Sequence, residues 1–137
     1  MEVIYRADKD VPCDKLLDLY RIGNYNTWWT ERNVRAWLNH CYLFITAWSG
    51  VQIVGTASAV SDGVNYAHIE DVLVHPSFRR KGIGTTMMKM ILERLQPLNL
   101  DFVQLTPIPG REPFFEQLGF QVVPDCHLME WVVADKK

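Results

Sequence analysis

The sequence has few cysteines, a small net charge and no long apolar run, and each shortage excludes a class of protein. Its three cysteines, Cys13, Cys41 and Cys126, lack metal-site spacing and cannot all pair, so we expect reduced thiols and no bound metal. A net charge of -2 gives no overall attraction to nucleic acid or to an anionic membrane. No apolar stretch is as long as a membrane span, and the first ten residues lack the apolar core of a secretory signal. We therefore expect a cytoplasmic protein that binds neither nucleic acid nor membranes.

Two widespread phosphate-binding motifs are also missing. The dinucleotide fingerprint needs a third glycine three residues after the second, but Met87 occupies that position after Gly82 and Gly84. The loop of nucleotide triphosphatases needs a Gly-Lys-Ser/Thr run, which the sequence does not contain. Repeats and linkers are absent, and 137 residues with 48% apolar and 22% charged side chains are typical of one compact domain, which we place at residues 1–137.

The most informative segment that is present is a glycine turn flanked by cations, residues 79–85, with the sequence Arg-Arg-Lys-Gly-Ile-Gly-Thr. It follows the apolar residues 72–74 and opens a helix-patterned stretch that Pro97 ends. A turn in this setting directs backbone N–H groups and the positive end of a helix dipole at one point. The segment predicts a phosphate or pyrophosphate site, although a tight turn before an ordinary helix would have the same pattern.

Hydrophobic periodicity predicts a mixed sheet flanked by helices, an α/β fold. We expect helices at residues 14–22, 30–38, 82–95 and 112–118. We expect strands at residues 2–6, 42–48, 53–60, 66–74, 102–105, 121–123 and 127–133. Gly119 is expected to end the last helix in a left-handed conformation.

Two segments resemble a known family. Residues 74–84 resemble the acyl-CoA signature of the GNAT N-acetyltransferase superfamily, Arg/Gln-x-x-Gly-x-Gly/Ala, and residues 114–120 resemble its late helix and Gly-Phe turn. The resemblance covers residues 42–123 well and the first forty only by general layout. It implies the GNAT fold, a central and mostly antiparallel sheet with splayed strands flanked by helices. It also implies acetyl-CoA as co-substrate, with no metal.

In this family the pyrophosphate of the co-substrate lies on the glycine turn, and the pantetheine arm pairs with the preceding strand like an added strand. The residues that the resemblance assigns to acetyl-CoA are Val72, Leu73, Val74, Arg79, Arg80, Lys81, Gly82, Ile83, Gly84, Thr85 and Phe115. Phe115 departs from the family, because many members have a tyrosine there that protonates the leaving thiolate. Water or another hydroxyl, such as that of Tyr66 or Thr106, would have to take that role.

Acyl transfer to an amine needs a group that accepts the amine proton. His68 and Glu70 precede the turn, and GNAT enzymes use a carboxylate or a histidine at such strand positions. Because side chains alternate along a strand, we expect these two residues on one face and Asp71 on the other. Glu70 would alternatively anchor a cationic amine, and a partly solvated strand would carry both side chains without any catalytic role.

Aromatic residues in the first forty positions are candidates for the acceptor site. Tyr25, Trp28 and Trp29 would suit a cationic or arylalkyl amine, whereas core packing is the alternative and the better account of Trp37. Residues 68–72 also resemble glucosamine-6-phosphate N-acetyltransferases, but residues 110–115 depart from those enzymes.

The sequence thus predicts an acetyl-CoA-dependent N-acetyltransferase acting on a primary amine of a small molecule by direct attack in a ternary complex. The alternatives are a non-catalytic acyl-CoA-binding module of the same fold and a protein-lysine acetyltransferase. The superfamily also makes a homodimer an open possibility.

Overall fold

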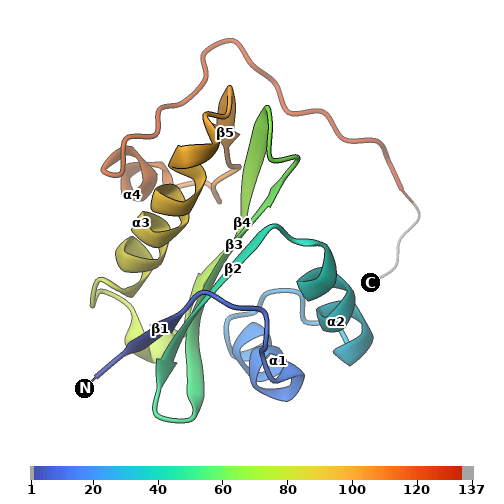
Figure 1. The fold of residues 1–137 in the computed structure, drawn as a ribbon, viewed down its shortest axis with the longest axis vertical. Coiled ribbons are helices and arrows are strands. Elements are labelled where there is room, and N and C mark those ends of the chain that lie inside the picture. Colours follow the sequence, from blue (N-terminus) through green and yellow to red (C-terminus); the bar gives the residue numbers. More distant parts are fainter. Residues whose placement is uncertain (1, 134–137) are drawn as a thin grey trace. The chain divides into compact units, whose positions relative to one another are not determined.

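The computed structural model describes residues 2–133 and divides the chain into two compact units, residues 1–105 and 106–137 (Figure 1). The helices of the first unit are α1 (Cys13–Ile22), α2 (Glu31–His40) and α3 (Ile83–Leu95), with short 3-10 turns η1 (Pro76–Phe78) and η2 (Gln96–Leu98). Its strands are β1 (Ile4–Arg6), β2 (Leu43–Ser49), β3 (Gln52–Ser61), β4 (Tyr66–Val74) and β5 (Phe102–Gln104). The second unit contains the helix α4 (Glu112–Glu116).

The five strands form one sheet in the order β1-β2-β3-β4-β5. The pairs from β1 to β4 are antiparallel, and β5 runs parallel to β4. The ladder between β4 and β5 is short: it joins Tyr66 to Phe102, Ala67 to Val103 and His68 to Gln104, and then ends. The prediction of a mostly antiparallel sheet flanked by helices is confirmed.

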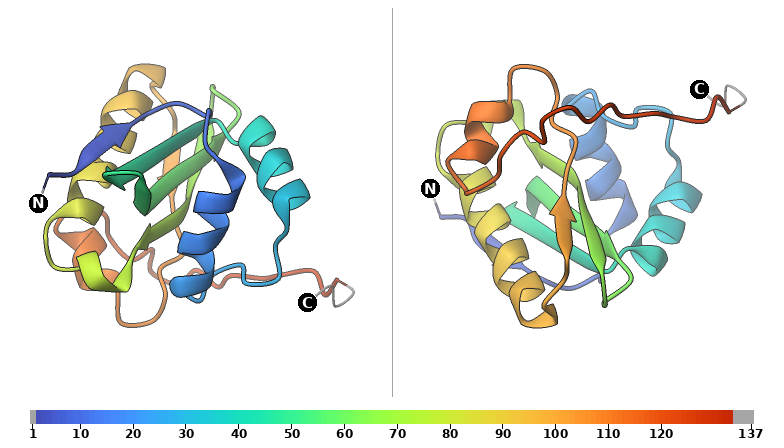
Figure 2. Two further views of the ribbon diagram at one scale, coloured as in Figure 1. Left: turned by 90° about the horizontal axis from the view of Figure 1, so that it is seen from below. Right: turned by 90° about the horizontal axis from the view of Figure 1, so that it is seen from above.

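Helices cover both faces of this sheet (Figures 1 and 2). One face packs against α3, whose buried side chains are Ile83, Met87, Met88, Ile91 and Leu95. The other face packs against α1 and α2, where Phe44 and Trp48 of β2 join a cluster with Leu16, Tyr20 and Val34. Burial of these apolar side chains supplies the main stabilisation of the sheet.

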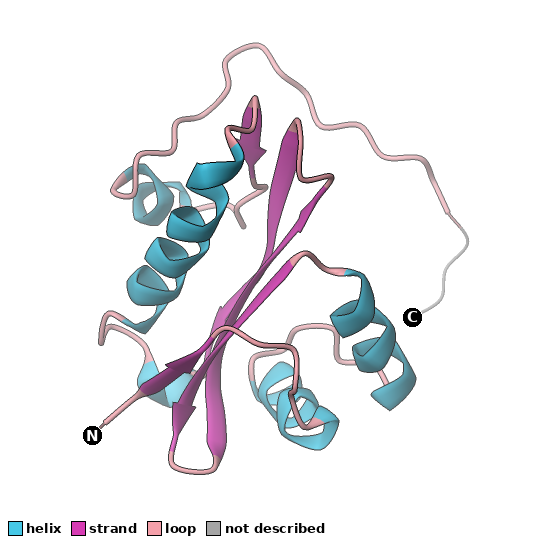
Figure 3. Cartoon of the chain, viewed as in Figure 1, coloured by secondary structure: helices cyan, strands magenta, loops and turns pink. Residues whose placement is uncertain are grey.

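The second unit has less regular structure than the sequence predicts. Gly119 follows α4 with φ 101°, the left-handed conformation expected of it. Residues 121–123 and 127–133, predicted as strands, are neither helix nor strand and are exposed (Figure 3). The prediction of these two strands is wrong for the structure described here, because an alternating apolar pattern makes a strand only where a neighbour completes the hydrogen-bond ladder.

Within residues 2–133, no helix has both the length and the apolar character needed to cross a bilayer.

Candidate active site

The glycine turn lies where predicted, between β4 and the first turn of α3. Gly82 is the residue before the helix and has a φ of 81°, and Arg80 is left-handed as well, with φ 63°. Gly82 provides no side-chain cap for α3, and a Cβ there would meet no atom within 4 Å. Because the first N–H groups of a helix lack partners in the helix itself, this uncapped end can donate to an anion.

Three exposed cations, Arg79, Arg80 and Lys81, precede the helix. The Nε of Arg79 donates to the carbonyl of Val74 at 3.2 Å, which ties the turn to the end of β4. The predicted phosphate site therefore combines helix N–H groups and positive charge on one exposed turn.

The edge of β4 that faces β5 is also available to a ligand beyond residue 68. The ladder to β5 ends at His68, and the pairs of Leu73 and Val74 lie on the opposite side of the strand, in β3. Among the described residues, no strand pairs with that edge at Val72, Leu73 or Val74. A linear ligand with amide groups could add to this edge as a strand does.

A β-bulge interrupts β4 just before these residues. Glu70 is opposite Ser58 and Leu73 is opposite Thr56, so two residues of β4, at positions 71 and 72, face the single residue between Ser58 and Thr56 in β3. Asp71 has φ 55°. The hydroxyl of Thr56 donates to the Asp71 carbonyl at 2.7 Å, which holds the bulged backbone in place.

The bulge places Asp71 on the same face as Glu70, and the prediction that they lie on opposite faces is wrong. Glu70 is opposite Ser58, which is opposite Phe44 of the cluster beneath α1 and α2. Asp71 reaches the same helices, because the Tyr20 hydroxyl of α1 donates to its Oδ2 at 2.9 Å. One extra residue in a strand moves the side chains of all following residues to the opposite face of the sheet, and here the extra residue is accommodated at Asp71, whose backbone is left-handed.

Asp71 is the buried centre of this site, with 7% of its surface exposed. Its Oδ1 accepts a hydrogen bond from Tyr25, so both carboxylate oxygens accept from tyrosines. Burial raises the pKa of Asp71, against the opposing effect of the tyrosine hydrogen bonds. Burial, and next the Asp71 charge, raise the pKa values of Tyr20 and Tyr25, so both phenols keep their protons and act as donors.

His68 and Glu70 share one face, as predicted. The His68 Nδ1 contacts the Glu70 Oε2, and 24% and 37% of the two side chains are exposed. The pair is therefore partly accessible to solvent beside a buried carboxylate. That position suits a group that accepts a proton, and the catalytic role of both residues stays a prediction.

The three predicted acceptor residues lie together, joined by Tyr20. The ring centroids are 5.3 Å apart for Tyr20–Tyr25, 5.9 Å for Tyr20–Trp29 and 6.4 Å for Trp28–Trp29, all edge to face. Trp28 is 38% exposed. Trp37 packs against the core, as expected, and its buried Nε1–H lies near the Asp71 carboxylate, where, against the larger effect of burial, it lowers the pKa of Asp71.

Asp71 and Tyr20 were not among the predicted site residues, although both lie in the segments that the sequence singled out. A bulge has no periodic signature, so the only available signal for Asp71 was a second acidic residue directly after Glu70. Tyr20 has helical spacing and reads as a core residue, which it is, apart from its hydroxyl.

Phe115 belongs to the second unit. Its ring contacts Phe114 at 4.9 Å and Phe120 at 6.1 Å between centroids. Its assignment to acetyl-CoA stays a prediction.

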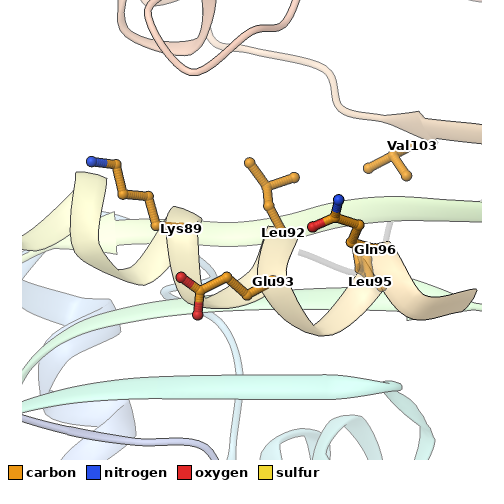
Figure 4. A pocket seen from close by; sticks show the side chains of 6 residues that line it. All are labelled: Lys89, Leu92, Glu93, Leu95, Gln96 and Val103. Atoms are coloured by element: carbon orange, nitrogen blue, oxygen red, sulfur yellow. The ribbon is translucent and has the colours of Figure 1, made fainter.

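The first unit also has two surface hollows. One, of about 400 Å³, lies between the C-terminal half of α3 and β5 (Figure 4). It is lined by Lys89, Leu92, Glu93, Leu95, Gln96 and Val103. The other, of about 330 Å³, involves α1 and the turn between β2 and β3, with His75. Neither contains a residue predicted to bind substrate or co-substrate. Among the described residues, no group of three or more His, Cys, Asp or Glu side chains could hold a metal ion.

Comparison with known proteins identifies the family. Residues 12–120 match the acetyltransferase (GNAT) family. The uncharacterized N-acetyltransferase ycf52 of Porphyra purpurea is 29% identical in an alignment 120 positions long that covers 81% of this chain and 69% of that protein. The GCN5-related N-acetyltransferase 1 of Arabidopsis thaliana chloroplasts is 39% identical over 72 residues, 53% of this chain and 36% of that protein, so the chain spans about a third of its length.

Solved structures agree with this match. An acetyltransferase of the GNAT family from Streptococcus pneumoniae superposes with a TM-score of 0.83 and 26% identity, over 98% of this chain and 100% of that one. A probable acetyltransferase from Staphylococcus aureus gives a TM-score of 0.82 at 18% identity, over 95% and 100% of the two chains, and supports the fold alone. With the family match covering residues 12–120 and the glycine turn at the predicted place, the chain belongs to the acetyltransferase (GNAT) family.

Proposed function

We propose that the protein transfers an acetyl group from acetyl-CoA to the primary amine of a small molecule. The observation that carries the proposal is the arrangement along residues 68–85. This continuous segment bears the His68–Glu70 pair, then the bulge, then the unpaired edge of β4, and finally the uncapped N-terminus of α3.

The donor would bind at the C-terminal end of this segment. The N–H groups of residues 82–85 and the cations at 79–81 would contact its pyrophosphate. The backbone of Val72 and Val74 would pair with its pantetheine arm. No metal is needed for this binding, because N–H groups and cations supply the countercharge.

The acceptor chemistry would take place at the other end. A protonated amine must lose a proton before it attacks the thioester, and Glu70, in contact with His68, is the partly exposed carboxylate that would take it. Direct attack forms the C–N bond, and collapse of the tetrahedral intermediate breaks the C–S bond. Phe115 has no proton to give, so water or a hydroxyl such as that of Tyr66 would protonate the thiolate.

The second candidate is a module that binds acyl-CoA without turnover, and Phe115 is the observation that favours it. The test measures CoA release from acetyl-CoA with 2-phenylethylamine, spermidine, glucosamine-6-phosphate and a lysine peptide, and identifies products by mass. We expect saturable release with at least one small amine and an acetylated product. Saturable binding of acetyl-CoA without turnover on any acceptor would refute the enzyme proposal, and turnover with the lysine peptide alone would refute the small-molecule assignment.

A further inference from the structure

We propose that the Tyr25 hydroxyl, held by Asp71, recognises the acceptor by accepting a hydrogen bond from its protonated amine. This inference rests on the proposed function, since it assumes that the acceptor is an amine, and it assigns that amine a binding group. Asp71 acts through Tyr25 and is a positioning residue, whereas Tyr25 contacts the ligand.

The first step concerns the direction of the hydrogen bond. Both oxygens of the Asp71 carboxylate accept from phenols, one from Tyr20 and one from Tyr25. The tyrosine hydroxyl is the donor in both contacts, so the proton between Tyr25 and Asp71 is that of the phenol. The Tyr25 hydroxyl donates its only proton to Asp71, so toward any other group it can act only as a hydrogen-bond acceptor.

The second step concerns what this hydroxyl oxygen can bind. A phenol oxygen carries two lone pairs, and the hydrogen bond that Tyr25 donates to Asp71 uses its proton and neither lone pair. The oxygen can therefore accept a hydrogen bond from a ligand donor. An ammonium group has three N–H donors and no acceptor, so it matches a hydroxyl fixed as an acceptor.

The surroundings of Tyr25 fit a cation. Glu70 directly precedes Asp71 and lies on the same face of β4, so a second carboxylate stands next to Asp71. Trp28 and Trp29 contact one another beside Tyr20, and aromatic faces attract cations and pack against apolar groups. An ammonium on a short apolar or aryl arm is the ligand that this combination of groups would bind.

The Asp71→Asn variant tests the direction of the hydrogen bond with little change in shape. An amide has one oxygen and one NH₂ group, so one of the two tyrosines must then accept instead of donate. Tyr20 is fully buried and its proton would lose its partner, whereas Tyr25 is only half-buried and can turn its proton toward solvent. Tyr25 is therefore the tyrosine that should accept a hydrogen bond from the amide introduced at position 71. Its own O–H would then point toward the ligand, and an ammonium group cannot accept that hydrogen bond.

The experiment measures binding of 2-phenylethylamine, with CoA present, to the wild type, Tyr25→Phe, Asp71→Asn and Ile91→Val. We expect the first two variants to weaken amine binding about ten- to a hundred-fold, the usual effect of a hydrogen bond to a charged group, while CoA affinity is unchanged. Ile91→Val is the control: it lowers stability from the α3 face of the sheet and should leave amine affinity unchanged. In turnover, the loss should appear in KM for the amine more than in kcat.

Several outcomes overturn the inference. Wild-type amine affinity in both Tyr25→Phe and Asp71→Asn would exclude the hydrogen bond. An equal loss of amine affinity in Ile91→Val would show that lower protein stability, and not the hydrogen bond, weakens amine binding. Failure of the wild type to bind 2-phenylethylamine would exclude the ligand class, even if another acceptor is acetylated. Amine binding that depends on Tyr25 without any acetyl transfer would instead support this inference and refute the proposed function.

Discussion

Replacing Gly82 by aspartate should separate anion binding from folding, because two opposing contributions to stability nearly cancel at this position while anion binding is weakened. A Cβ at Gly82 meets no atom within 4 Å, so the substitution causes no clash. The positive φ of 81° costs a non-glycine residue about 1 kcal/mol, and a negative charge at the N-terminus of α3 returns about 0.3–1 kcal/mol. Stability should therefore change little.

CoA affinity should fall much more. A carboxylate at residue 82 would lie about 5 Å from a pyrophosphate on the turn, where two unit charges repel by about 1 kcal/mol in water and about 3 kcal/mol in a protein-like medium. This repulsion corresponds to a dissociation constant for CoA that is about 5- to 150-fold larger. Screening should reduce the ratio between variant and wild type as salt is raised.

Gly63→Asp is the matched control. Gly63 has φ 77° and equally open surroundings, and β4, nine residues long, extends about 30 Å between its turn and the end that leads to Gly82. Both variants change the net charge equally and both strain the backbone. Calorimetric titration with CoA, with thermal unfolding alongside, should show weakened binding for Gly82→Asp alone. Equal affinities in the two variants would refute the assignment of the anion site.

Three further predictions concern single side chains. Glu70→Gln should lower turnover about 100-fold and leave CoA affinity unchanged, since it removes the proton acceptor, and wild-type turnover would exclude that role. Tyr20→Phe should lower the free energy of unfolding by about 2 kcal/mol near neutral pH, because Asp71 loses a buried donor. Because the pKa of Tyr20 is raised in the folded protein, its protonated phenol stabilises the fold fully below about pH 10 and progressively less above that pH. The free energy of unfolding of Tyr20→Phe should therefore depend less on pH above about pH 10 than that of the wild type. The same pH dependence in both proteins would contradict this account. Phe115→Tyr should retain or raise turnover, and a tenfold drop in steady-state rate would mean that the ring shapes the site.

Much of the first unit was predictable from periodicity. The helix from Ile83 to Leu95 and the strand from Tyr66 to Val74 were expected almost at their observed bounds, because the helix buries one regular face and the strand is bounded by two turns. The glycine turn was predictable because its residues act locally, through backbone conformation and charge. The second unit was not, since residues 121–133 have the composition of strands but their ladder depends on a neighbour that the sequence does not specify.

The acidic residues of the site could be predicted only in part. Alternation correctly placed His68 and Glu70 together, but it gave Asp71 the wrong face, because a bulge depends on a mismatch with β3 and not on the residues of β4 alone. The pairing of Asp71 with Tyr20 and Tyr25 joins residues about fifty positions apart and leaves no periodic trace in the sequence.

The extra residue in β4 also sets the phase of the strand. Before the bulge, the even-numbered residues His68 and Glu70 face α1 and α2, while after it the odd-numbered Leu73 does, packing against Gly23 and the core beneath those helices. β4 therefore behaves as two short strands of opposite parity joined at Asp71. Deleting Val72 would merge them into one frame, so a single-residue deletion there should do more damage to the site than most substitutions. In a mutational scan of β4, the even-numbered positions up to Glu70 and the odd-numbered positions from Asp71 onward should therefore be compared as the set that faces α1 and α2.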